Sequence, residues 1–185
     1  TLLASSAASD VYKRQEKFKE IENQVNADEF VDRKIISVEK ETILNGAGIN
    51  LEIYECKPYP KSDPPHFLYL GRIMKEKGMD ELFSAAEKLH DDGYKFVLDL
   101  VGFFEDEYKE RVELLESKGV VKFHGFQEEP RPYYATADCV VMPSYHEGMS
   151  NVNLEASATG RPVITTNIPG CRESVENEYT GWLCE

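Results

Sequence analysis

The chain has 185 residues, of which 41% are hydrophobic and 30% charged, and these fractions are ordinary for a globular protein with a sizeable core. Its formal net charge of −13 argues against nucleic acid or an anionic membrane surface as partner, because clustered lysines and arginines bind both. No apolar run approaches the roughly 20 residues that span a bilayer.

The first third of the chain has little regular pattern. Residues 1–15 are rich in Ser and Ala, lack the basic start of a secretory signal, and are expected to be a non-native or disordered leader. Residues 16–56 are interpreted as the remnant of a preceding domain, within which residues 16–24 predict a short amphipathic helix. Residues 57–65 contain four prolines within eight positions, which predicts an extended linker and a domain boundary.

Beyond this linker, short apolar runs alternate with amphipathic stripes. Strands are expected at 66–70, 96–101, 120–123, 140–142, 162–165 and 181–184. Helices are expected at 79–89, 108–115, 131–137 and 151–159. The alternation predicts an α/β fold, a doubly wound Rossmann-like parallel sheet over residues 66–185 that is truncated at its C-terminus. Such sheets bind ligands at the carboxyl ends of their strands.

The four cysteines indicate a compartment rather than a site. They are Cys56, Cys139, Cys171 and Cys184. Since they form neither a CxxC pair nor a metal-ligand spacing with histidine, they are expected to be small buried thiols in a reducing, cytoplasmic environment.

A stretch of small residues after the fourth expected strand contains two glutamates, Glu147 and Glu155, eight positions apart. Ser150 and Asn151 are good N-cap candidates for the helix that follows, which places Glu155 about one turn inside it. The amides of Met149, Ser150 and Asn151 are expected to be unpaired and to favour an anion such as phosphate. Glu155 is then placed to accept hydrogen bonds from a ribose, although acidic residues near helix starts commonly do no more than complement the dipole.

The loop after the first expected strand, residues 71–78, brings cations to the same edge of the sheet. Arg72 is able to bind two phosphate oxygens at once, and Lys77 adds charge at the start of the next helix. The alternative is a solvated loop with a salt bridge to Glu76.

Further candidates at this edge are Phe126 and Gln127, which follow the third expected strand and are reasonable neighbours for a nucleotide base. His146 is a possible contact, but a lone loop histidine is more commonly incidental. Neither GxGxxG nor GxxxxGK[ST] occurs, so the sequence does not support dinucleotide binding of the dehydrogenase type or a P-loop.

Together these motifs resemble the C-terminal half of retaining glycosyltransferases of family four, which have the GT-B fold. The motifs, in chain order, are Gly71-Arg72, Glu76-Lys77-Gly78, Pro143-Ser144, Glu147-Gly148, Glu155-Ala156 and Gly160-Arg161-Pro162-Val163-Ile164. The two glutamates stand at the family's E-x7-E spacing, and the resemblance extends from about residue 34 to 185.

The resemblance implies a hexosyltransferase that uses a nucleotide-diphosphate sugar, most often UDP-linked, in cell-surface polysaccharide synthesis, with no metal or other cofactor. By resemblance, Arg72 and Lys77 neutralise the diphosphate, and Glu147 contacts the donor sugar near its anomeric carbon. Glu155 holds the ribose. The expected donor-binding residues are Gly71, Arg72, Lys77, Phe126, Gln127, Glu147, Gly148, Met149, Ser150, Asn151 and Glu155.

The chain departs from the family in one large respect, because the acceptor-binding half is represented only by about residues 34–53 and the closing helices are missing. We therefore expect a fragment that is inactive alone. The full-length enzyme is expected to use a glycan or lipid-linked acceptor at the inner face of the membrane. Two alternatives are open, a non-catalytic nucleotide-sugar-binding module or subunit and a sugar-nucleotide epimerase. Copurification with a separate acceptor-binding chain would favour the first, and product analysis with donor alone would identify the second.

Overall fold

The computed structural model describes residues 19–21, 31–34, 41–43 and 48–185, which form parts of two compact units, Thr1–Ala47 and Gly48–Glu185. In the first unit, β1 (Lys19–Ile21) pairs in parallel with β2 (Glu41–Ile43). The helix expected over residues 16–24 is therefore wrong at β1. An isolated helix of this length is marginal in water, whereas the strand gains backbone partners from β2. The leader expected at 1–15 lies outside the described residues.

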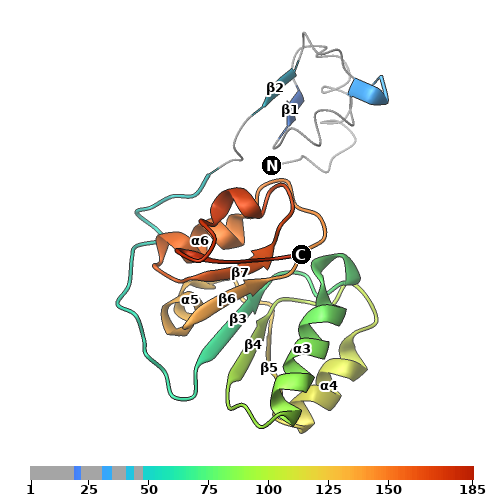
Figure 1. The fold of residues 1–185 in the computed structure, drawn as a ribbon, viewed down its shortest axis with the longest axis vertical. Helices are drawn as coiled ribbons and strands as arrows, with labels where there is room; N and C mark the ends of the chain where they lie inside the picture. Colours follow the sequence, from blue (N-terminus) through green and yellow to red (C-terminus); the bar gives the residue numbers. More distant parts are fainter. Residues whose placement is uncertain (1–18, 22–30, 35–40, 44–47) are drawn as a thin grey trace. The chain divides into compact units, whose positions relative to one another are not determined.

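The second unit is built on six parallel strands in the order β5-β4-β3-β6-β7-β8. The strands are β3 (His66–Leu70), β4 (Val97–Val101), β5 (Lys122–Gly125), β6 (Cys139–Met142), β7 (Val163–Thr166) and β8 (Gly181–Cys184). From β3 the chain moves outward through β4 and β5, then returns to the other side of β3 at β6 and moves outward through β7 and β8 (Figure 1). The strand order thus reverses between β3 and β6, and ligands bind Rossmann-like sheets at such a switch point.

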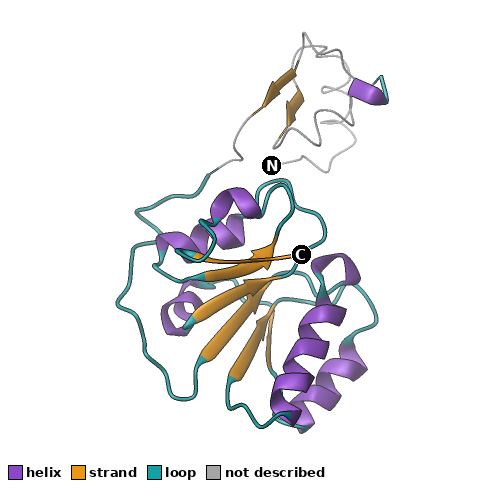
Figure 2. Cartoon of the chain, in the orientation of Figure 1, coloured by secondary structure: helices purple, strands orange, loops and turns teal. Residues whose placement is uncertain are grey.

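Helices cover both faces of this sheet (Figure 2). They are α3 (Met79–Asp91), α4 (Lys109–Ser117), α5 (Arg131–Thr136) and α6 (Asn151–Ala158), with short 3₁₀ turns η2 (Lys75–Lys77) and η3 (Arg172–Ser174). One core joins α3 and α4 to the sheet through residues such as Phe83 and Leu100, and another joins α5 and α6 through residues such as Leu68 and Ala156. This arrangement confirms the predicted doubly wound fold.

Several local expectations change with the three-dimensional packing. The strand expected at 120–123 is observed as β5, two residues further along. Val120 and Val121, whose apolar side chains suggested a strand, are buried in the segment that precedes it. Leu89 was expected on the buried face of α3 but is exposed, since it lies in the last turn, past the buried residues of that helix. Cys56 and Cys184 are exposed, so the expectation of buried thiols holds only for the other two cysteines.

The proline-rich segment 57–65 belongs to the second unit, contains neither helix nor strand, and packs beside Asp138. The Tyr59 hydroxyl donates to the Asp138 carbonyl at 3.0 Å, and the Ser62 amide donates to the carboxylate at 3.1 Å. The domain boundary expected at this segment stays a prediction. No helix within the described residues is long and apolar enough to cross a membrane.

Candidate functional site

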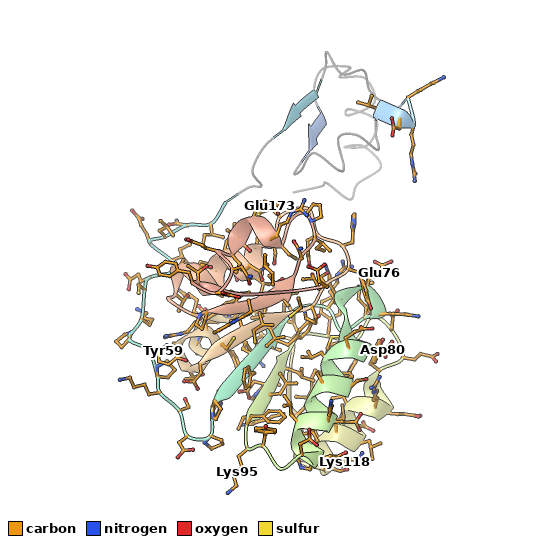
Figure 3. The ribbon with its side chains drawn as sticks, in the orientation of Figure 1. Tyr59, Glu76, Asp80, Lys95, Lys118 and Glu173 are labelled. Atoms are coloured by element: carbon orange, nitrogen blue, oxygen red, sulfur yellow. The ribbon has the colours of Figure 1, made fainter. Side chains whose placement is uncertain are left out.

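The two loops that carry most of the predicted site residues meet at the switch point of the sheet. The Tyr145 amide donates to the Glu76 carbonyl at 2.9 Å, which ties the loop after β6 to the loop after β3. Figure 3 shows Glu76 beside the start of α3, at the opposite end of the unit from Lys118. A Cβ on Gly78 would lie 1.9 Å from the Pro143 carbonyl oxygen, and the φ of Gly78 is 70°. Only glycine therefore lets α3 begin this close to the second loop.

An ion pair joins the two loops at their centre. Lys77 Nζ donates to Glu147 Oε1 at 2.7 Å, and the two side chains are only 15% and 17% exposed. A pair this sheltered is less screened by water than a surface salt bridge. The hydroxyl of the fully buried Tyr69 donates to the Arg72 carbonyl at 2.5 Å, beneath the first loop. Burial and the charge of Glu147 raise the pKa of Tyr69, so this hydroxyl stays protonated as a donor.

Arg72 lies at the outer edge of the site. Its Nη1 is 2.8 Å from Glu105 Oε2, with both side chains close to half exposed. The alternative considered from the sequence named Glu76 as the partner, whereas the observed partner comes from the loop after β4. Exposed pairs contribute about 0–1 kcal/mol, so an incoming anion can compete for the guanidinium at little cost.

The start of α6 is capped largely as predicted. Ser150 is the N-cap, and its hydroxyl oxygen accepts from the Asn153 amide at 3.4 Å. The Ser150 amide, expected to be unpaired, instead donates to the Gly170 carbonyl at 2.8 Å. Gly170 approaches so closely that a Cβ there would lie 2.3 Å from the Gly148 carbonyl oxygen. Within residues 48–185, the amides of Met149 and Asn151 have no protein partner, so the predicted anion site has lost one donor.

Glu155 is held by a side chain that the sequence reasoning missed. The Tyr134 hydroxyl donates to Glu155 Oε2 at 2.7 Å, and the ring of Tyr54 packs edge to face on Tyr134. Tyr134 resembles an ordinary core residue of a short helix, and Tyr54 lies in a segment without a motif. No signal in the sequence could have paired them with Glu155, because the contacts form only in three dimensions.

The two residues proposed for the base behave differently. Phe126 is 65% exposed and packs edge to face with Phe103, with ring centroids 6.2 Å apart. The Gln127 side-chain amide donates to the His124 carbonyl at 2.7 Å, so it turns back toward its own strand. Within residues 48–185, no hydrogen bond, ion pair or ring contact links Phe126 or Gln127 to the loop 71–78. His146 is exposed at the loop surface.

The described residues contain no group of three or more His, Cys, Asp or Glu side chains that could hold a metal ion. The cationic side chains described above are Lys77 and Arg72. The expectation that the reaction needs no metal stays a prediction.

The fold and the site together define a Rossmann-like domain that holds the Lys77–Glu147 pair at the switch point of its sheet and carries Glu155 on the following helix. The chain belongs to the family described as glycosyl transferases group 1, whose model matches residues 55–185. This agrees with the coarse part of the resemblance found in its motifs.

Individual relatives support this assignment. The capsular polysaccharide biosynthesis glycosyltransferase CapM of Staphylococcus aureus is 34% identical over 121 residues, 63% of this chain and 32% of CapM. The lipopolysaccharide core biosynthesis glycosyltransferase LpsE of Rhizobium meliloti is 33% identical over 125 residues, 68% of this chain and 36% of LpsE. The chain thus spans about a third of the length of these curated relatives.

A solved structure shares the fold. Anabaena HepE, crystallised with UDP and glucose, superposes with a TM-score of 0.75 at 22% identity, covering 96% of this chain and 52% of HepE. The predicted fold class, an α/β doubly wound Rossmann-like parallel sheet of the kind found in GT-B glycosyltransferases, is therefore confirmed.

Proposed function

We propose that this chain binds a UDP-linked sugar and forms the donor half of a retaining glycosyltransferase of family four, a hexosyltransferase. The observation that carries the proposal is the sheltered Lys77–Glu147 pair at the switch point, where both loops of the crevice meet. A cation that faces the crevice suits a diphosphate, and a carboxylate beside it suits the hydroxyls of the attached sugar.

In the proposed reaction, the bond between the sugar and the diphosphate breaks as negative charge builds on the departing phosphate. Arg72 and Lys77, with the free amides at the start of α6, stabilise that charge. Preorganised cations of this kind can supply the charge stabilisation that a divalent ion supplies elsewhere. Glu147 contacts the donor sugar near its anomeric carbon, and Glu155 holds the ribose.

The names of the relatives bear on substrate and pathway. HepE was crystallised with UDP and glucose, which supports UDP as the nucleotide of the donor here. CapM and LpsE are named for capsular polysaccharide and lipopolysaccharide core biosynthesis, which supports a role in cell-surface polysaccharide synthesis with a glycan or lipid-linked acceptor. The cytoplasmic location expected from the cysteines stays a prediction.

Calorimetry with UDP tests the donor site through a matched pair of lysines in η2. Lys77→Met should weaken UDP binding about 10-fold, because a charge-assisted contact to phosphate is lost. Lys75→Met removes an exposed charge from the same turn and should change affinity less than about twofold. Equal losses in both variants would mean that general charge, rather than a site at the switch point, attracts the nucleotide.

Product analysis with UDP-glucose and a longer form of the protein separates the proposal from its two alternatives. A retaining transferase passes the sugar to an acceptor with its anomeric configuration unchanged. An epimerase alters the donor without an acceptor, and a binding module returns it intact.

A further inference from the structure

The hydroxyl of Tyr134 binds Glu155, and a second tyrosine from a distant part of the chain packs against Tyr134. Tyr134 belongs to α5 and donates to Glu155 Oε2 at 2.7 Å. Tyr54 lies just before the proline-rich segment, and its ring packs edge to face with that of Tyr134, with centroids 6.1 Å apart. Tyr54 therefore supports the ring that holds the glutamate.

Both phenols remain proton donors across the physiological range. Burial, followed by the charge of Glu155, raises the pKa of Tyr54 to about 12 and raises that of Tyr134 well above its usual value. A phenol has one proton to donate, and a carboxylate can only accept. The hydrogen bond between Tyr134 and Glu155 therefore runs from the phenol to the carboxylate.

A buried arginine, Arg161, holds the backbone of Tyr134. Arg161 is 2% exposed, and its Nε donates to the Tyr134 carbonyl at 2.8 Å. Its Nη2 donates to the carbonyls of Ala135 at 3.2 Å and Pro58 at 2.9 Å. A helix as short as α5 is marginal alone, so this guanidinium fixes both the end of the helix and the proline-rich segment that follows Tyr54.

The remaining acceptor capacity of Glu155 matches a ribose. A carboxylate offers about four acceptor positions, and the Tyr134 phenol uses one of them. The positions that remain are enough for the two hydroxyls, 2′ and 3′, that the ribose of a nucleoside diphosphate presents. Because Glu155 is only partly buried, a ligand can still reach it.

We propose that Tyr134 is a positioning residue that orients Glu155 for the ribose hydroxyls of the donor, an inference that rests on the ribose role proposed above for Glu155. Without this phenol, the glutamate side chain would sample several rotamers and pay that entropy when the ligand binds. Tyr134 raises affinity by removing this cost, and it does so only for ligands that carry ribose hydroxyls.

Calorimetry on the 185-residue chain tests this with two ligands, UDP and 2′,3′-dideoxyuridine diphosphate. Tyr134→Phe should weaken UDP binding about 3- to 10-fold, the effect of one hydrogen bond to a charged group acting indirectly. Binding of the dideoxy analogue should change less than twofold. Tyr133→Phe is the matched control, because it makes the same substitution in α5 at a ring that packs on His124 instead, and it should leave both affinities unchanged.

Equal losses for the two ligands would overturn the positioning role, because Tyr134 would then not act through the ribose. Glu155→Ala tests the ribose assignment separately from the positioning role. If it lowers UDP affinity while Tyr134→Phe binds like wild type, the ribose assignment stands and the positioning role fails. If Glu155→Ala binds UDP normally, the ribose assignment fails and the positioning role fails with it. Should Tyr134→Phe not fold, Tyr54→Leu decides the matter, because it removes the ring that packs on Tyr134 and lies outside the helices.

Discussion

Glu155→Ala and Glu147→Ala should reduce affinity for different sets of ligands. Glu155 is assigned to the ribose, which UDP and a UDP-sugar share, so Glu155→Ala should weaken both ligands alike. Loss of charge-assisted hydrogen bonds predicts roughly 1.5–3 kcal/mol, or about 10- to 150-fold in affinity. The variant also leaves the fully buried Tyr134 hydroxyl without its acceptor, which should lower the free energy of unfolding by about 1–3 kcal/mol.

Glu147 is assigned to the sugar, so Glu147→Ala should leave UDP affinity almost unchanged while reducing affinity for UDP-glucose. The structure adds a reason for this asymmetry. The substitution frees Lys77 Nζ from its 2.7 Å contact, and the released ammonium remains available to the diphosphate. In the full-length enzyme, the same variant should also lower the rate of transfer.

Calorimetry of both variants against UDP and UDP-glucose measures these four affinities, with Glu155→Gln as a control that keeps the shape and an acceptor oxygen. Thermal melting of each variant separates lost binding from lost folding. Equal losses for the two Ala variants, or a greater loss of free UDP in Glu147→Ala, would show that the assigned roles of the pair are wrong.

Two further predictions concern stability. Gly78→Ala should lower the free energy of unfolding by about 2–4 kcal/mol, because its backbone is left-handed and the added Cβ would clash with the Pro143 carbonyl. Gly93 is also left-handed but has nothing within 4 Å of an added Cβ, so Gly93→Ala should lower the free energy of unfolding by only about 1 kcal/mol. Equal losses in denaturant titrations of the two variants would refute the close approach at Gly78. The pKa values of Tyr54 and Tyr108 are raised from 10.0 to about 12 by burial and neighbouring carboxylates, so the folded state binds these protons more tightly than the unfolded state. The stability they provide should be complete below pH 10 and fall as the pH rises through 12, and denaturant titrations that show the same stability across this range would contradict it.

The fold could be predicted because its signals are local. Apolar runs mark buried parallel strands, amphipathic stripes mark the covering helices, and both alternate along the second unit. The edge of the sheet that holds the site follows from the same pattern, since the carboxyl ends of parallel strands share one edge. The Lys77 and Glu147 loops could thus be assigned to a common crevice, although 70 residues separate the two side chains.

What the sequence could not reveal depends on contacts between distant segments. The Ser150 amide looked unpaired because nothing nearby in the chain accepts from it, yet the Gly170 carbonyl reaches it in the fold. The Tyr54 and Tyr134 hydroxyls carry no motif that points to Glu155. The strand at Lys19–Ile21 was missed for the same reason, because its partner, Glu41–Ile43, lies 22 positions further along the chain.

Titration of UDP-glucose into the 185-residue chain, in buffer with a metal chelator and with the ligand followed by NMR, tests the central claim most directly. The account predicts weak binding that UDP displaces and that needs no Mn²⁺ or Mg²⁺. It also predicts that the donor stays intact, because the chain spans only about a third of the length of its curated relatives. A strict requirement for a divalent ion, the absence of binding at millimolar ligand, or transfer of the sugar by this chain alone would contradict it.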